Sequence, residues 1–97
     1  MATFIALVNF TDKGLQNIKD SPTRAKAFGE MAKKLGVSVK DIYWTQGQYD
    51  MVVTLEAADE ATASSLMLSV AALGNVRGQT LRAFSRDELG KILTKMV

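Results

Sequence analysis

The side chains that could do chemistry in this 97-residue chain are restricted by what it lacks, namely any histidine or cysteine. Their absence removes the commonest general base and metal ligand, and with them disulfides and thiolate nucleophiles. Carboxylates are the remaining metal ligands, and Asp50 with Glu56 or Asp59 is the set to consider. Along an extended chain, Asp50 and Glu56 lie about 20 Å apart, which is too far for one ion. We therefore predict no metal and no cofactor.

A second set that could do chemistry combines an amide, aromatic rings, a carboxylate and an arginine. It consists of Asn9, Tyr43, Trp44, Glu56 and Arg82. If Asn9 and Trp44 lie on adjacent strands and on one face, they could line a site for a cofactor-independent reaction. The structural alternative is that Asn9 ends a strand and Trp44 packs in the core or at an interface, where aromatic residues usually lie. We favour the structural alternative.

The element that must position these residues is a predicted hairpin over Ile42–Glu56. Its first run contains β-branched and aromatic residues that suit a strand. Its second run, Asp50–Glu56, alternates apolar and polar residues with the period of a strand. Gly47 between the runs can adopt positive φ, which a tight connection often needs. Tyr49 is expected to cover the turn, and Asp50 to accept hydrogen bonds from local backbone N–H groups.

Two further strands and a helix are predicted outside the hairpin. The strands are Thr3–Phe10 and Val76–Phe84. The helix between the first strand and the hairpin is predicted to have Ser21 as its N-cap and Pro22 at its first helical position. Gly36 is predicted to end it in a left-handed conformation.

The remaining two helices have their own start signals. Asp59 can cap a helix that Gly74-Asn75 ends. Ser85 and Glu88 have the spacing of a capping box. The helix that they open has an apolar stripe of Leu89, Ile92, Leu93 and Met96. Such an amphipathic terminal helix usually docks on its own domain or on a partner.

The element order is β-α-β-β-α-β with an extra C-terminal helix, in one domain over residues 1–97. This order predicts a ferredoxin-like α+β fold, with two helices on one face of a four-stranded antiparallel sheet. We place on the helix side Phe4, Ala6, Val8, Phe10, Met51, Val53, Leu55, Leu81 and Ala83. We place on the open side Ile5, Leu7, Asn9, Val52, Thr54, Glu56, Thr80, Arg82 and Phe84, joined by Tyr43 or Trp44 according to the register.

The open side is too apolar to stay wet in a small domain. Two such faces packed about a two-fold axis would be buried, and could leave a cavity between them. We therefore expect a homodimer or a higher homo-oligomer. The candidate ligand-binding residues are Asn9, Tyr43, Trp44, Thr54, Glu56, Thr80 and Arg82.

Charge and hydropathy exclude other partners. Twelve basic and ten acidic residues give a net charge of +2, and Lys33-Lys34 is the only adjacent basic pair. Nucleic-acid binding predicts a basic patch or an aromatic-rich RNA-binding motif, and neither is present. No apolar run approaches the roughly 20 residues that span a bilayer. The segment Met1–Val8 has the pattern of a strand rather than of a signal peptide. We expect a cytoplasmic protein that binds neither nucleic acid nor membrane.

Several blocks of the sequence resemble the GYD-domain family. The blocks are Gly47-x-Tyr49-Asp50 followed by Met51–Asp59, Gly74–Arg77, Thr80–Phe84, Thr11-x-x-Gly14 and Ser21-Pro22-x-Arg24. The resemblance covers nearly the whole chain. It implies a small bacterial or archaeal protein of the dimeric α+β-barrel type. It implies no reaction, because the family is one of unknown function, so Gly47, Tyr49 and Asp50 carry over as a signature and not as a catalytic set.

Two functions are consistent with these observations. The first is a homodimer that binds a small molecule in the barrel interior, or acts as a regulatory or interaction module without catalysis. The second is a cofactor-independent enzyme similar to the small monooxygenases among dimeric α+β barrels, an analogy of fold only. The second requires Asn9 and Trp44 to share a sheet face, and we favour the first.

Overall fold

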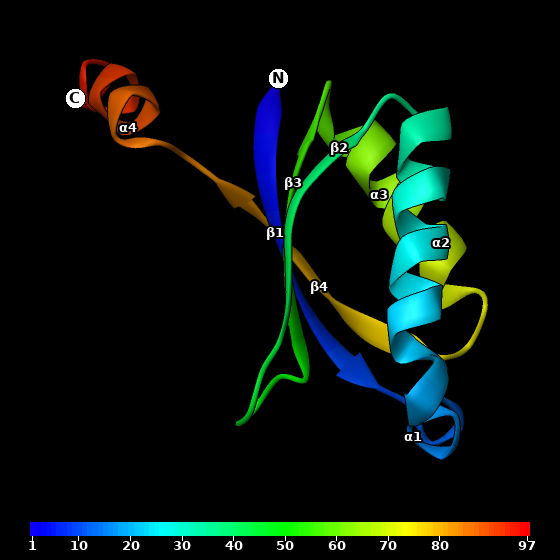
Figure 1. Cartoon of the computed structure of the whole chain (residues 1–97). Helices are drawn as coiled ribbons and strands as arrows, with labels where there is room; N and C mark the ends of the chain where they lie inside the picture. The colour runs from blue at the N-terminus through cyan, green and yellow to red at the C-terminus, as the bar shows by residue number, and fades with distance from the viewer.

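A four-stranded antiparallel sheet is the centre of the protein, whose computed structural model describes residues 1–97 (Figure 1). Its strands are β1 (Ala2–Phe10), β2 (Ser38–Trp44), β3 (Met51–Ala57) and β4 (Val76–Ala83). Their order across the sheet is β2-β3-β1-β4, and each neighbouring pair is antiparallel. This is the split β-α-β arrangement of a ferredoxin-like domain, so the fold class predicted for the chain is confirmed.

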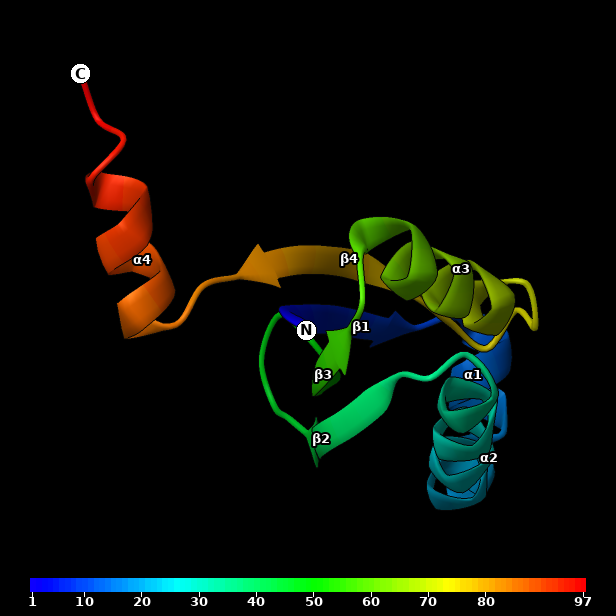
Figure 2. The ribbon, with the colours of Figure 1, turned by 90° about the horizontal axis from the view of Figure 1, so that it is seen from above.

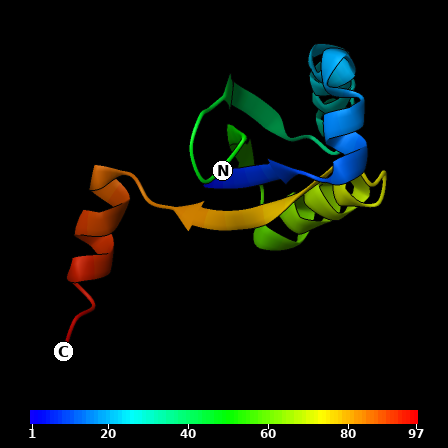
Figure 3. The ribbon, with the colours of Figure 1, turned by 90° about the horizontal axis from the view of Figure 1, so that it is seen from below.

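The helical elements are α1 (Asp12–Gln16), a 3₁₀ helix (Ile18–Asp20), α2 (Ser21–Lys34), α3 (Glu60–Ala71) and α4 (Arg86–Leu93). Figure 1 shows α2 and α3 on one side of the sheet and no helix directly on the other face. The helix α4 lies apart from the sheet, on the side away from α2 and α3 and beyond the end of β4. Figure 2 and Figure 3 show the same separation from above and from below.

The hydrophobic core lies between the sheet and the helices α2 and α3. Alternate residues of β1 and β3 point into it, because successive side chains of a strand point to opposite faces. Leu55 and Leu66 are completely buried, and burying a leucine side chain contributes about 1.5–3 kcal/mol. The twelve buried core residues are Phe4, Ala6, Val8, Phe28, Ala32, Val37, Met51, Val53, Leu55, Ala57, Ala63 and Leu66.

The helix α2 ends as predicted but begins differently. Gly36 has a φ of +70°, and the N–H of Val37 donates to the carbonyl of Ala32, as in a Schellman motif. At the other end, Ser21 is the first helical residue and not the N-cap. The 3₁₀ helix runs directly into α2, so the Ser21 hydroxyl is not used for capping and instead accepts a hydrogen bond from Trp44.

The helices α3 and α4 begin at the predicted caps. The Asp59 carboxylate accepts from the backbone N–H of Thr62 at 2.8 Å. At the start of α4, the Ser85 hydroxyl accepts from the N–H of Glu88, and the Glu88 carboxylate accepts from the N–H of Ser85. The capping box is therefore complete, which satisfies two N–H groups that the helix leaves unpaired.

The register of β4 is the reverse of the prediction. Directly opposed residues of an antiparallel pair point to the same face. Arg82 lies opposite the buried Phe4, whereas Leu81 lies opposite an open-side residue of β1. Thr80 and Arg82 are therefore on the helix side, and Leu81 and Ala83 are on the open side.

The expectation that apolar residues point inward failed on β4, which is an edge strand of the sheet. The guanidinium carbon of Arg82 lies 5.6 Å from the ring centre of Phe4 and 4.5 Å from that of Phe84. A guanidinium over an aromatic face is electrostatically favourable. A charged residue is therefore stable at an inward-facing position on this strand.

The structure also fixes the register of β2, which the sequence left open. The pairing of β2 with β3 shifts around Lys40. After this irregularity, Tyr43 lies opposite Val52 on the open side, and Trp44 lies opposite the buried Met51 on the helix side.

Candidate functional site

The open sheet face carries three rows of side chains that cross all four strands. From β2 to β4 the rows are Tyr43, Val52, Leu7 and Gln79; Asp41, Thr54, Ile5 and Leu81; and Ser38, Glu56, Thr3 and Ala83. Val52, Leu7, Ile5 and Leu81 form an apolar patch across β3, β1 and β4, and most of the polar residues lie on β2 and toward the ends of the strands. Apolar patches bordered by polar residues are typical of protein–protein interfaces.

The structure divides the seven predicted ligand-binding residues between the two faces. Asn9, Tyr43, Thr54 and Glu56 are on the open face, whereas Trp44, Thr80 and Arg82 are on the helix side. Since Asn9 and Trp44 lie on opposite faces, the pairing on which the enzyme hypothesis rested is wrong. Among the open-face residues, the Glu56 carboxylate already pairs with Lys40, at 3.2 Å.

Trp44 links the sheet to a helix. Its indole Nε1 donates to the Ser21 hydroxyl at 2.9 Å, and Ser21 is buried. A buried hydroxyl without a partner costs about 1–3 kcal/mol, so this bond stabilises the contact between the end of β2 and the start of α2. Trp44 is 47% exposed, so its structural role rests on this hydrogen bond.

The loop Gly47–Asp50 ties the hairpin to β1. Gly47 has a φ of +118°, which favours glycine. The Asp50 carboxylate accepts from the N–H of Phe10 at 2.9 Å, and the N–H of Asp50 donates to the Val8 carbonyl at the same distance. The side-chain partner of Asp50 is thus 40 residues away in sequence and not in the local turn, where it was expected.

Tyr49 extends from the same loop across the open side. Its hydroxyl accepts from the side-chain amide of Gln79 at 3.1 Å, and Gln79 belongs to the open face of β4. The Thr45 hydroxyl donates to the Tyr49 carbonyl at 2.6 Å. Tyr49 therefore connects the hairpin to the opposite edge strand of the sheet.

Arg82 holds the base of α4. Its Nη2 lies 3.4 Å from a Glu88 oxygen and its Nε 3.8 Å from a Glu60 oxygen. Its Nη1 also donates to the Ala83 carbonyl. With aromatic rings beneath it and two carboxylates beside it, the guanidinium joins β4 to the starts of α3 and α4.

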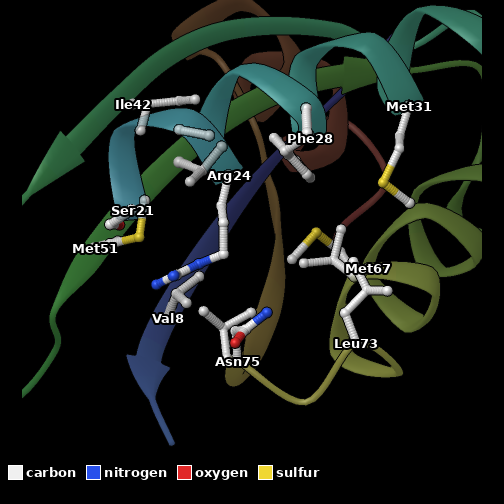
Figure 4. Close-up of a pocket in the computed structure, with 15 residues that line it drawn as sticks. Val8, Ser21, Arg24, Phe28, Met31, Ile42, Met51, Met67, Leu73 and Asn75 are labelled. Atoms are coloured by element: carbon white, nitrogen blue, oxygen red, sulfur yellow. The ribbon is translucent and has the colours of Figure 1, made fainter. Parts of the chain in front are cut away.

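A cavity of about 130 Å³ lies between α2, α3 and the sheet (Figure 4). Its lining is almost entirely apolar and includes Phe28, Met31 and Met67. Arg24 also lines it, and its guanidinium donates to the Asn17 carbonyl at 2.8 Å. No local sequence pattern predicts this cavity, because its existence depends on the spacing between two helices. The only sequence signal is the presence of methionines, which adapt to irregular gaps, at inward positions.

Two carboxyl groups have shifted acidities, and both are helix caps. A backbone hydrogen bond from Thr62 lowers the pKa of Asp59, and one from Ser85 lowers the pKa of Glu88. These shifts mark helix N-termini and not a cleft prepared for proton transfer. No group of three or more acidic side chains is arranged to hold a metal ion. None of the helices combines the length and the hydropathy needed to cross a lipid bilayer.

The structure defines a ferredoxin-like α+β domain with one sheet face bare of helices. Two of the three signature residues, Tyr49 and Asp50, tie the strands of that sheet together. The chain belongs to the GYD domain family, which matches it over residues 4–93.

Known proteins of similar sequence and fold agree with this membership. A Thermus thermophilus protein named glutamine synthetase and cystathionine beta-lyase binding protein is 39% identical over 90 residues, covering 92% of this chain and 95% of the relative. The crystal structure of a T. thermophilus protein has a TM-score of 0.57 and 25% identity, covering 88% of this chain and 95% of that one. The crystal structure of MtbAldR has a TM-score of 0.62 and 16% identity over 88% of this chain and 52% of that chain, which shows the fold alone.

Proposed function

We propose that this protein is a non-enzymatic interaction module that works as a homodimer and binds a metabolic enzyme. The observation that carries the proposal is the bare sheet face, with its apolar patch across β3, β1 and β4. The name of the T. thermophilus relative, which refers to binding of glutamine synthetase and cystathionine beta-lyase, supports an enzyme as the partner. A cytoplasmic location is part of the proposal.

The open sheet face is the dimer interface in this proposal. Ile5, Leu7 and Val52 are only half-buried in the single chain, and Leu81 is exposed. Pairing about a two-fold axis places the same apolar set opposite itself, so one contact buries both copies of the face. The four residues lie on the three adjacent strands β3, β1 and β4, so the apolar area is continuous across the sheet.

A charge placed in this face tests the dimer. We expect Leu7→Asp to raise the dimer dissociation constant at least about a hundredfold, because it buries an unpaired carboxylate twice in each dimer. Sedimentation equilibrium measures the change, and circular dichroism checks that the variant is folded. Thr23→Asp, which adds the same charge on an exposed position of α2, is the control and should dimerise normally. A full-length chain that stays monomeric at hundreds of micromolar would contradict the dimer.

The outer face of α3 is the surface that we assign to the enzyme partner. No charged residue occurs between Ala61 and Leu73. Leu68 on α3 is 70% exposed, and Leu73, two residues after the helix, is 56% exposed. Apolar, charge-poor surface of this kind is typical of the core of an interface. Because α3 lies on the side away from the open face, it stays accessible in the proposed dimer (Figure 1).

The partner is tested with glutamine synthetase and cystathionine beta-lyase purified from the organism that carries this chain. We expect micromolar or tighter binding of at least one enzyme by isothermal titration calorimetry. Leu68→Asp should weaken it at least tenfold, because one buried unpaired charge costs more than about 1.4 kcal/mol. Thr23→Asp should bind normally. Absence of binding to both enzymes would refute this partner class, and normal binding by Leu68→Asp would exclude α3 as the contact surface.

A second candidate function is small-molecule binding between the paired sheets. It is favoured by Asn9, Tyr43, Thr54 and Glu56, which all face the space that a second sheet would close. A metabolite that raises the melting temperature of the wild-type dimer, and fails to do so with Thr54→Val, would support it. No stabilisation across a broad metabolite set would refute it.

A further inference from the structure

The helix α4 makes the molecule longer than a compact domain of its size. The radius of gyration is 14.6 Å and the longest dimension is 50 Å, whereas about 12.5 Å is expected for the radius of a compact domain of 97 residues. Figure 2 shows the reason, since α4 stands away from the sheet at the end of β4. It makes no substantial packing contact with any other helix or strand.

The base of α4 is nevertheless held in a defined position. Only Phe84 and Ser85 separate β4 from α4. The capping box fixes the first turn, and the ion pair of Arg82 with Glu88 ties that turn to β4. These contacts are all polar and all lie at the N-terminal end of the helix. These contacts within the chain therefore set the direction of α4 relative to β4.

The apolar side of α4 has no partner within the chain. Its stripe recurs with helical spacing, and its members are 40–72% exposed. The stripe consists of Leu89, Ile92, Leu93 and Met96. A helix of eight residues is marginal in water without tertiary packing, since isolated helices shorter than about 12–15 residues rarely hold their structure. The stripe therefore needs a surface to cover it.

We propose that α4 is an exchange arm whose apolar stripe packs on a second copy of this chain. The inference rests on the homodimer of the proposed function. The arm and the open face project to the same side of the molecule, away from α2 and α3 (Figure 1). A second copy that covers the open face therefore arrives beside the arm and brings an identical arm of its own. One two-fold contact then covers both faces and both stripes.

The areas involved favour a second copy as the occupant. Four strands of about seven residues present roughly 440 Å² of face, from spacings of about 4.8 Å between strands and 3.3 Å along them. A stable interface buries about 800 Å² on each partner. An arm about 12 Å long and 10 Å wide, with the equal area that receives the partner's arm, brings the total to roughly 700 Å². The arm and the area that receives the partner's arm thus enlarge the footprint of the contact by about half, toward the size that a stable dimer needs.

Charged substitutions on the two sides of α4 provide a matched test. Leu89→Glu with Leu93→Glu places two carboxylates in the stripe. Gly90→Glu with Thr94→Glu places two outside the stripe, and a side chain at Gly90 meets open space. We expect the stripe variant to raise the dimer dissociation constant at least about a hundredfold, since four leucines are lost from each dimer. The control variant should dimerise within about threefold of the wild type.

Hydrogen exchange of the α4 amides gives an independent readout. With an exchange arm, protection of Leu89 to Leu93 should rise with protein concentration and follow the dimer fraction. Protection that does not change with concentration would mean that α4 folds back on its own chain, and would overturn the proposal. Equal dimer affinity of the stripe and control variants would overturn it as well.

The results of these experiments distinguish failure of the α4 arm from failure of the homodimer or of enzyme binding. If the stripe variant dimerises normally while Leu7→Asp does not, the sheet-to-sheet dimer stands and the arm is refuted. If the wild-type chain is monomeric, the dimer and the arm fail together, while binding of an enzyme through α3 is still measured by calorimetry. If the stripe variant loses dimerisation at low micromolar concentration and regains it at high concentration, while the Gly90→Glu/Thr94→Glu control dimerises normally, the arm is supported.

Discussion

Replacing Asp50 with alanine removes the side-chain hydrogen bond that ties the hairpin loop to β1. The Asp50 carboxylate accepts from the N–H of Phe10 at 2.9 Å, and hydrogen bonds to charged groups are worth about 1.5–3 kcal/mol. Both residues are half-buried, so the lower end of that range applies. We expect Asp50→Ala to lower the free energy of unfolding by about 1.5 kcal/mol. Asp50→Asn keeps a neutral acceptor, and about half that loss is expected.

Urea denaturation at a fixed protomer concentration measures these changes, with circular dichroism and the fluorescence of Trp44, the only tryptophan, as probes. For a domain of this size, about 1.5 kcal/mol corresponds to a fall of about 6–12 °C in melting temperature. Gln48→Ala in the same exposed loop is the control and should change stability by less than about 0.5 kcal/mol. If Asp50→Ala is as stable as this control, the hydrogen bond to Phe10 does not explain the signature aspartate. A binding role of Asp50 should then be tested.

Two further predictions concern glycines and acidity. Gly14→Ala should destabilise the fold by about 2 kcal/mol or more, because a Cβ there would lie 2.1 Å from the Asn75 carbonyl oxygen and overpacking typically costs about 1–3 kcal/mol. Gly29→Ala, in open space on α2, should instead stabilise the fold by about 0.5–1 kcal/mol. Equal effects of the two substitutions in thermal denaturation would contradict this explanation. The hydrogen bond from Ser85 lowers the pKa of Glu88 below its ordinary value of 4.5, so its stabilisation of α4 is complete above that value and is lost as the pH falls through the folded pKa. NMR should therefore show constant helicity of α4 from neutral pH to about pH 5 and a loss of helicity in acid. The Glu88→Gln variant should not show this pH dependence.

The features that the sequence predicted correctly are those with a local cause. The cap at Asp59, the capping box at Ser85 and Glu88, and the left-handed glycine at Gly36 each depend on residues within a few positions of one another. The order of strands and helices follows from such signals together with apolar periodicity. This information was sufficient for the fold class, because the split β-α-β order admits few arrangements of the sheet.

The features that could not be predicted depend on partners far apart in sequence. The hydrogen bond from Trp44 to Ser21 spans 23 residues and the one from Phe10 to Asp50 spans 40, and no local pattern specifies either. The register of β4 was predicted wrongly because Arg82 is stabilised on the helix side by rings and carboxylates from other elements. Only four of the seven candidate residues therefore share the open face, since the face of each strand residue depends on the register.

Different contacts hold the two ends of the sheet, and each of these contacts affects the shape of the open face. At the hairpin end, Tyr49 bonds to Gln79 and so ties the loop to the edge strand β4. At the other end, Arg82 and Glu88 orient α4 beside the same face. A change in the signature can therefore alter self-association by moving β4, without direct contact between Tyr49 and a second copy. A Tyr49 variant that dimerises more weakly can therefore have lost either a direct contact or its bond to Gln79. A Gln79→Ala variant distinguishes the two. If it dimerises normally, the weaker dimerisation of the Tyr49 variant identifies Tyr49 as a contact residue.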